Sequence, residues 1–116
     1  MTVLIVDDHP SFRASARTLL EAEGFDVVGE AENGETAVEA ARALHPDLVL
    51  LDVQLPGIDG FTVADRLRKL EDPPVVILTS SRDGADYGRC ICECGAHGFV
   101  PKAELSGAAI AAFFAA

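Results

Sequence analysis

Polar side chains follow the short apolar runs of this chain at the points where the runs end. Asp7 and Asp8 follow TVLIV, Asp52 follows LVLL, Thr79 follows VVIL, and Lys102 comes just after GFVP. Carboxylate ligands without Cys or His suit Mg²⁺ or Mn²⁺. A lysine ammonium and a threonine hydroxyl can both bind an anionic group. This set indicates metal-assisted phosphoryl transfer with a carboxylate as the nucleophile.

The apolar runs that carry these residues are typical of buried strands, and helical patterns separate them. Strands are predicted at 2–6, 26–31, 47–51, 74–79 and 97–100, and helices at 10–23, 34–44, 60–70, 85–94 and 104–114. This alternation predicts an α/β fold, a five-stranded parallel sheet flanked by five helices. Functional crevices of such sheets lie beyond the carboxyl ends of the strands. The polar residues should therefore meet at one edge.

Local signals support the predicted helix boundaries. Pro10 suits a first helical position, and Gly24 is a plausible stop for the same helix. Asn33 and Asp59 are predicted N-caps of the two following helices. Asp8 has a structural alternative of the same kind, because it could cap the helix that begins at Pro10. The joint placement of the polar residues after several strands favours the functional hypothesis.

Composition and charge narrow the classes of function. The chain has 116 residues, of which 49% are hydrophobic, and a formal net charge of −10. This predicts one globular domain. It argues against direct binding of nucleic acid or of an anionic membrane, because both require clustered Lys and Arg. No signal peptide or spanning run is recognised, so a cytoplasmic location is expected.

Four stretches carry a resemblance to a known family. In order they are LIVDDHP, LVLLDVQLPGIDG, VVILTS and GFVPKAEL, and they extend from residue 3 to about residue 105. Together they resemble the receiver domain of bacterial two-component response regulators, and DDHP and GFVPKAEL resemble the NarL/FixJ type. The resemblance implies a CheY-like, flavodoxin-like sheet with strand order 2-1-3-4-5.

The resemblance also implies roles for the site residues. Asp52 matches the phosphoacceptor, which takes a phosphoryl group from a sensor histidine kinase or a phosphotransfer protein. Asp7 and Asp8 match the acidic pair that holds Mg²⁺, or Mn²⁺, with Asp8 favoured as the direct ligand. Asp52 and the backbone carbonyl of Gln54 complete the implied metal site. No organic cofactor is implied.

A conformational switch is implied as well. Thr79 and Lys102 match the residues that close onto the phosphoryl group, and Phe99 matches the aromatic switch whose rotamer follows Thr79. The fourth helix and fifth strand would shift between two pre-existing states. A homodimer through the fourth helix, fifth strand and fifth helix is a further possible partner arrangement.

The resemblance implies a phosphoacceptor rather than an enzyme, with at most self-phosphorylation and self-dephosphorylation. Residues 1–116 are expected to form a single receiver domain without an effector domain, either stand-alone or excised from a transcription regulator. One alternative is a phosphorylation-independent interaction module, which the intact acidic pair and Lys102 disfavour. Another is a Mg²⁺-dependent phosphohydrolase. Such an enzyme would carry a second Asp where this chain has Gln54.

Several features depart from the pattern or stay open. Proline precedes Lys102 instead of following it, so the usual cis bond after the lysine is not carried over. Cys90, Cys92 and Cys94 lack zinc-site spacing and are predicted to be free thiols, with redox sensing or metal binding as alternatives. Phe113 and Phe114 are adjacent, so one should face outward, at an interaction surface or at a fraying end. His9 is expected to be a solvated loop residue.

Overall fold

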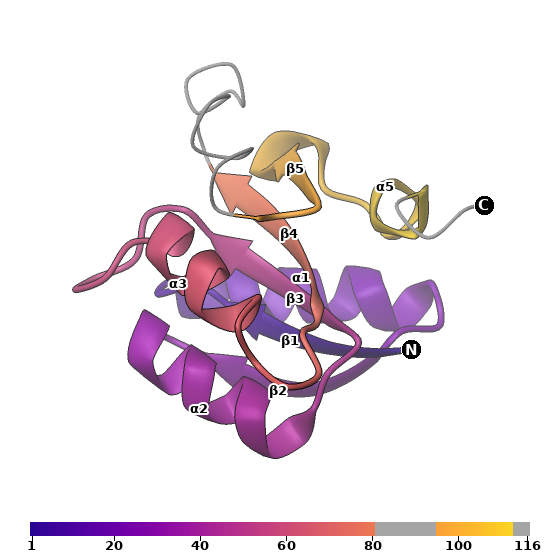
Figure 1. Ribbon diagram of the computed structural model, residues 1–116. Coiled ribbons are helices and arrows are strands. Elements are labelled where there is room, and N and C mark those ends of the chain that lie inside the picture. Colours follow the sequence, from indigo (N-terminus) through magenta and orange to yellow (C-terminus); the bar gives the residue numbers. More distant parts are fainter. Residues whose placement is uncertain (81–94, 113–116) are drawn as a thin grey trace.

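The strands form one parallel sheet with helices on both faces (Figure 1). The computed structural model describes residues 1–80 and 95–112. The strand order is β2-β1-β3-β4-β5, as the resemblance implied. The bounds are β1 (Thr2–Val6), β2 (Asp26–Ala31), β3 (Leu48–Asp52), β4 (Val75–Ser80) and β5 (Gly98–Pro101). The predicted α/β class is therefore confirmed, with the last three strands shifted by one residue.

Four α-helices cover the sheet in the part of the chain that the structure describes. They are α1 (Pro10–Ala22), α2 (Gly34–Leu44), α3 (Gly60–Leu67) and α5 (Gly107–Ala111). Residues of α1 and α5 pack in one hydrophobic cluster with one face of the sheet, and residues of α2 and α3 pack in a second cluster on the other face. Because both faces are covered, β1, β3 and β4 are apolar and buried along most of their length, whereas the edge strand β2 also carries exposed acidic residues.

The predicted helix boundaries have clear local causes. Pro10 occupies the start of α1, where its missing N–H costs nothing. The side chains of Asn33 and Asp59 accept backbone N–H bonds from Thr36 and Thr62 at 2.9 and 2.8 Å. Gly24 follows α1 with a φ of +92°, a left-handed conformation that glycine adopts at low cost. These caps fix where the connections from strand to helix begin.

The C-terminal region differs from the prediction. The last helix begins at Gly107 rather than at residue 104, because Lys102–Glu104 form a 3₁₀ turn, η2, and Leu105 is extended. Ser106 caps α5, since its Oγ accepts the N–H of Ala109 at 3.0 Å. The predicted fourth helix at 85–94, its three cysteines, and Phe113 and Phe114 lie outside the described residues. Peptide bonds in the described segments are trans, including those beside Lys102.

The third helix is also shorter than predicted, ending at Leu67 rather than at residue 70. The N–H groups of Lys69 and Leu70 bond to carbonyls three residues back, which is the tighter 3₁₀ pattern.

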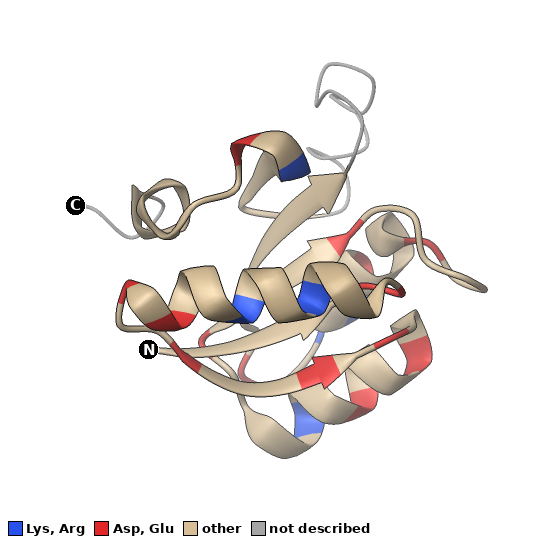
Figure 2. Ribbon diagram, turned by 180° about the vertical axis from the view of Figure 1, so that it is seen from behind, with Lys and Arg blue, Asp and Glu red and all other residues tan. Residues whose placement is uncertain are grey.

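Acidic residues lie along α2 and near both ends of α1, and basic residues are spread over several elements (Figure 2). None of the described helices has the length and apolar character needed to cross a membrane.

Gly60 is the residue at which the start of α3 packs against the carboxyl end of β3. A Cβ at this position would overlap the backbone oxygen of Asp52 and lie 2.7 Å from the Cα of Val53. The Gly60 N–H donates to the Val53 carbonyl at 2.8 Å, so the first turn of α3 rests directly on the chain that follows Asp52. Only glycine allows this approach without moving one of the two segments.

We therefore expect Gly60→Ala to lower the free energy of unfolding by about 1–3 kcal/mol, the usual cost of overpacking. This loss would occur although Ala is the better helix former by ~1 kcal/mol. Urea unfolding measures it. Thr62→Ala, at an exposed position of the same helix, is the control and should change stability by less than about 0.5 kcal/mol. A Gly60→Ala variant as stable as the parent would contradict the packing described.

Candidate functional site

The predicted site residues meet at the carboxyl edge of the sheet. Asp7 directly follows β1, Asp52 ends β3, Thr79 lies in β4, and Lys102 begins the turn after β5. Asp52 and Thr79 are register partners on adjacent strands. Parallel pairing thus brings together side chains that lie far apart in the sequence, as the strand-end pattern predicted.

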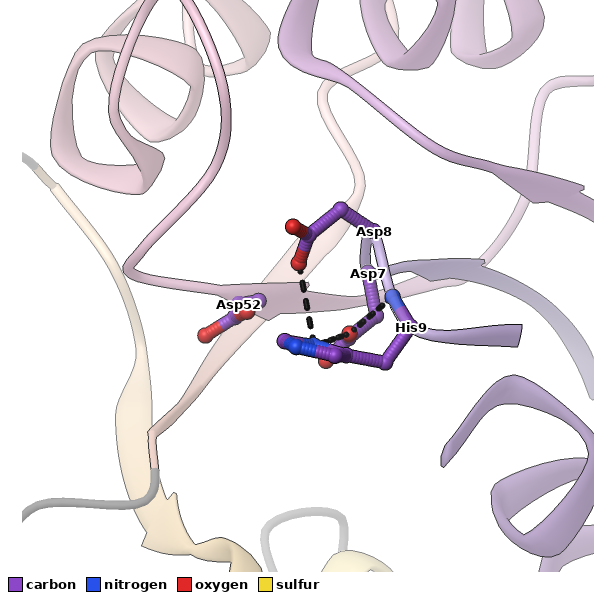
Figure 3. Close-up of side chains that lie close together, drawn as sticks. All are labelled: Asp7, Asp8, His9 and Asp52. Carbon is purple, nitrogen blue, oxygen red and sulfur yellow. Dashed lines mark hydrogen bonds and ion pairs between the residues drawn. The ribbon is translucent and has the colours of Figure 1, made fainter. Parts of the chain in front are cut away.

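The acidic pair and His9 form a compact group (Figure 3). The Asp7 carboxylate is fully buried, and its Oδ1 accepts the backbone N–H of His9 at 2.8 Å. The His9 ring nitrogen Nδ1 lies 3.0 Å from Asp7 Oδ1 and 3.1 Å from Asp8 Oδ1. One potential ligand atom from each of Asp7, Asp8, His9 and Asp52 lies within 4.8 Å of all the others. His9 is 64% exposed in the loop between β1 and α1, as expected, and its contacts with the two carboxylates come in addition.

Asp52 is held in an environment that disfavours its charge. Its side chain is buried, with Oδ1 accepting the Gln54 N–H at 3.2 Å. The pKa of Asp52 is raised to about 6, first by burial and then by repulsion from Asp7, with a smaller contribution from Asp8. The attraction of Lys102 and the Gln54 hydrogen bond act in the opposite direction. Asp52 is therefore an unusually basic carboxylate.

Lys102 is the cation of the site. Its ammonium Nζ lies 2.6 Å from Asp7 Oδ2 and 3.5 Å from Asp52 Oδ2. The contact with the buried Asp7 carboxylate is thus the shorter of the two ion pairs. The same ammonium stands 4.3 Å from the centroid of the Phe12 ring. One positive charge is thus shared between two buried negative ones.

Thr79 places a hydroxyl in the buried part of the site. Among the described residues its Oγ1 has no hydrogen-bond partner, and the residue has no exposed surface. An unsatisfied buried hydroxyl costs about 1–3 kcal/mol, so its retention calls for an explanation. Phe99, the predicted aromatic switch, pairs with Leu78 across β4 and β5 and is half-buried against the cluster beneath α2 and α3.

Arg13 is a contributor that the sequence analysis missed. Its Nη1 donates to the backbone carbonyl of Asp7 at 2.6 Å, and its Nε donates to Glu30 at 3.0 Å. These bonds join the first turns of α1 to the ends of β1 and β2, and they fix the backbone from which Asp7 and Asp8 project. The available signal was weak, because a helical arginine is usually a solvated charge.

The donor set fits a hard divalent cation. Asp7, Asp8 and Asp52 supply carboxylate oxygens, and their mutual repulsion would be relieved by a positive ion. The resemblance implied the backbone carbonyl of Gln54 as a further ligand, and the structure places the N–H of this residue 3.2 Å from Asp52 Oδ1. His9 adds a nitrogen, which Mg²⁺ does not prefer. The carboxylates are thus the groups that could hold Mg²⁺.

Comparisons with known proteins agree with this geometry. Residues 3–112 match the family model described as the response regulator receiver domain. The DNA-binding transcriptional activator EvgA of Escherichia coli is 37% identical over 116 residues, which cover the whole chain and 57% of EvgA. This chain belongs to the response regulator receiver domain family.

Solved structures show the same fold in relatives. The signal receiver domain of NarL from Mycobacterium tuberculosis superposes with a TM-score of 0.87 at 36% identity, covering 99% of this chain and 97% of that one. The BeF₃-activated N-terminal receiver domain of RstA from Klebsiella pneumoniae gives a TM-score of 0.85 at 30% identity, covering 98% and 96%. The chain spans about half the length of the curated relatives it matches.

The raised pKa of Asp52 predicts a pH-dependent stability. Between its ordinary value of 3.8 and about 6, the folded chain binds more protons at this group than the unfolded chain does. The free energy of unfolding therefore falls as pH rises through this window. Without a divalent cation, Asp52→Asn should be more stable than the parent by roughly 1–3 kcal/mol at about pH 7.5, and the gain should vanish near pH 4.

Urea unfolding in a chelating buffer at the two pH values measures this difference. Asp72→Asn, which removes an exposed carboxylate and changes the net charge equally, is the matched control. An Asp52→Asn gain no larger than that of Asp72→Asn at the higher pH would refute the electrostatic description of the site.

Proposed function

We propose that this chain is a phosphorylation-dependent switch that accepts a phosphoryl group on Asp52 in a Mg²⁺-dependent reaction. The observation that carries the proposal is the buried Asp52 carboxylate beside Asp7 and Asp8, with the Lys102 ammonium at 3.5 Å. The neighbouring strand adds the Thr79 hydroxyl, which has no hydrogen-bond partner within the described part of the chain. These are the groups needed to hold a metal, a nucleophile and a doubly charged product in one place.

The donor of the phosphoryl group would be a phosphohistidine of a sensor histidine kinase or of a phosphotransfer protein. A carboxylate oxygen of Asp52 attacks phosphorus, an O–P bond forms, the N–P bond breaks, and its electron pair returns to the imidazole. With a pKa of about 6, Asp52 is mostly ionised at neutral pH. A Mg²⁺ ion held by Asp7, Asp8, Asp52 and the Gln54 carbonyl would neutralise developing charge on the phosphoryl oxygens.

The structural response starts from the two groups closest to the new charge. Phosphorylation adds roughly −1.5 to −2 charges and new acceptor oxygens. Lys102 can leave its ion pair with Asp7 for these oxygens, and the Thr79 hydroxyl gains the acceptor that it lacks. Movement of Thr79 would free space for a new rotamer of Phe99. The result is a shift between two states that exist before phosphorylation.

We infer the wider role from the relatives. EvgA is named as a DNA-binding transcriptional activator, and it is longer than this chain. Residues 1–116 would therefore act as a single receiver domain in the cytoplasm, controlling an effector domain or partner in transcription regulation. A homodimer through the fourth helix, β5 and α5 is the arrangement proposed for the active state. The described Lys and Arg residues stand on several elements among acidic residues (Figure 2), and the chain carries 19 acidic and 9 basic residues, which supports a receiver that does not itself bind DNA.

Incubation with acetyl phosphate and Mg²⁺ tests the chemistry. We expect the mass of one phosphoryl group to be added, in a linkage that hydroxylamine cleaves, and to be absent without Mg²⁺ or in Asp52→Asn. Asp59→Asn is the matched control, because Asp59 is an exposed neighbour whose role as N-cap asparagine preserves. It should be phosphorylated like the parent.

Four outcomes would contradict the proposal. No phosphoryl group on the parent chain, or an equal amount on Asp52→Asn, would remove Asp52 as the acceptor. Partner binding that is unchanged by Asp52→Asn and by the phosphoryl mimic BeF₃⁻ would favour a phosphorylation-independent interaction module. Continuous turnover of small phosphate esters would instead indicate a phosphohydrolase.

A further inference from the structure

In the described segments, the ammonium of Lys102 lies close to two carboxylates and to one uncharged aromatic ring. Nζ lies 2.6 Å from Asp7 Oδ2, 3.5 Å from Asp52 Oδ2 and 4.3 Å from the centroid of the Phe12 ring. The lysine side chain is only 18% exposed. Little water is therefore left to stabilise its charge, which strengthens its attraction to a ring face.

The Phe12 ring is anchored independently of the charges. Phe12 lies in the first turn of α1, which begins at Pro10. Its side chain packs against the hydrophobic cluster on this face of the sheet, which includes Ile77 and Val100. The core and the start of α1 thus set the position of the ring, and neither depends on the charges of the site.

An uncharged ring beside Lys102 leaves the charge of the ammonium free to act on the proposed phosphoryl group. The quadrupole of an aromatic ring attracts a cation without cancelling its charge. A third carboxylate in the same place would hold the ammonium more firmly, but it would also repel an incoming phosphoryl group. The ring can keep the ammonium inside the site while leaving its full charge available to the phosphoryl oxygens.

We propose that Phe12 is a positioning residue that holds the Lys102 ammonium at the Asp52 carboxylate through its ring face and thereby sets the rate of phosphoryl transfer to Asp52. The inference rests on the proposed function, because it concerns the same reaction. Loss of the ring attraction lets the lysine stem move toward solvent, and the transition state loses part of its charge stabilisation.

Packing alone is the competing explanation for Phe12, and fluorination separates the two. Replacing ring hydrogens with fluorine weakens the negative face of the ring with little change in its shape. Mono-, di- and trifluorinated phenylalanine at position 12 should lower the rate constant for phosphorylation by acetyl phosphate in steps, to a total loss of about three- to tenfold. Phe12→Leu should show a loss of similar size.

The controls make the outcome specific. The same analogues at Phe25, which is half-buried against the same cluster, should leave the rate unchanged. Urea unfolding of each analogue should match the parent. Proton NMR should show upfield-shifted Lys102 side-chain methylene signals in the parent and their loss in Phe12→Leu.

The inference is overturned if the parent chain is phosphorylated and the variants fluorinated at position 12 are phosphorylated at the same rate. Equal losses at positions 12 and 25 would also overturn it, because they would indicate packing. A parent chain that takes no phosphoryl group would overturn the proposed function and this inference together. Persistence of the Lys102 upfield shift in Phe12→Leu would refute the geometry itself.

Discussion

The structure depends on one electrostatic constraint, the confinement of several carboxylates at a single edge of the sheet with one ammonium among them. Asp7 and Asp52 are both buried, and Lys102 contacts each of them. Their repulsion, together with burial, accounts for the pKa of about 6 at Asp52. The carboxylates carry more negative charge than the single ammonium of Lys102 neutralises. A bound cation would therefore stabilise the folded site. The raised pKa also makes Asp52 a better nucleophile than an exposed carboxylate, because a more basic oxygen donates its electron pair more readily.

The rest of the fold holds the carboxylates of Asp7 and Asp52 close together against their mutual repulsion. Parallel pairing aligns Asp52 with Thr79, and buried apolar strands keep water away from both. Gly60 allows α3 to begin directly against the chain that follows Asp52. Arg13 fixes the backbone carbonyl of Asp7 from the side of α1. These contacts hold the acidic residues together against their mutual repulsion. Under the proposed function, Lys102 and Thr79 can therefore move toward a phosphoryl group while the rest of the fold stays in place.

Much of this arrangement was predictable from the sequence, and what was not has identifiable causes. Apolar runs that end in polar residues predicted the strands and gathered Asp7, Asp52, Thr79 and Lys102 at one edge. Strand order came from the resemblance, since alternating strands and helices fit more than one order. Two interactions could not be predicted, those of Phe12 with Lys102 and of Arg13 with Asp7. Each joins a residue of α1 to a residue outside that helix, and residue type alone does not indicate such a pairing. The late start of α5 was foreseeable, because Ser106 is a good N-cap, but the extended Leu105 before it has no local signal.

Titration of the Asp52 carboxyl carbon by NMR observes the mutual repulsion of these carboxylates itself. In a chelating buffer we expect a midpoint at about 6, well above the ordinary pKa of 3.8, and a fall in this midpoint when Mg²⁺ is added. The fall should be lost when Asp8 is replaced by Asn, because one of the oxygen donors is then neutral. A midpoint near 3.8 in the absence of the metal, unchanged by its addition, would contradict the account.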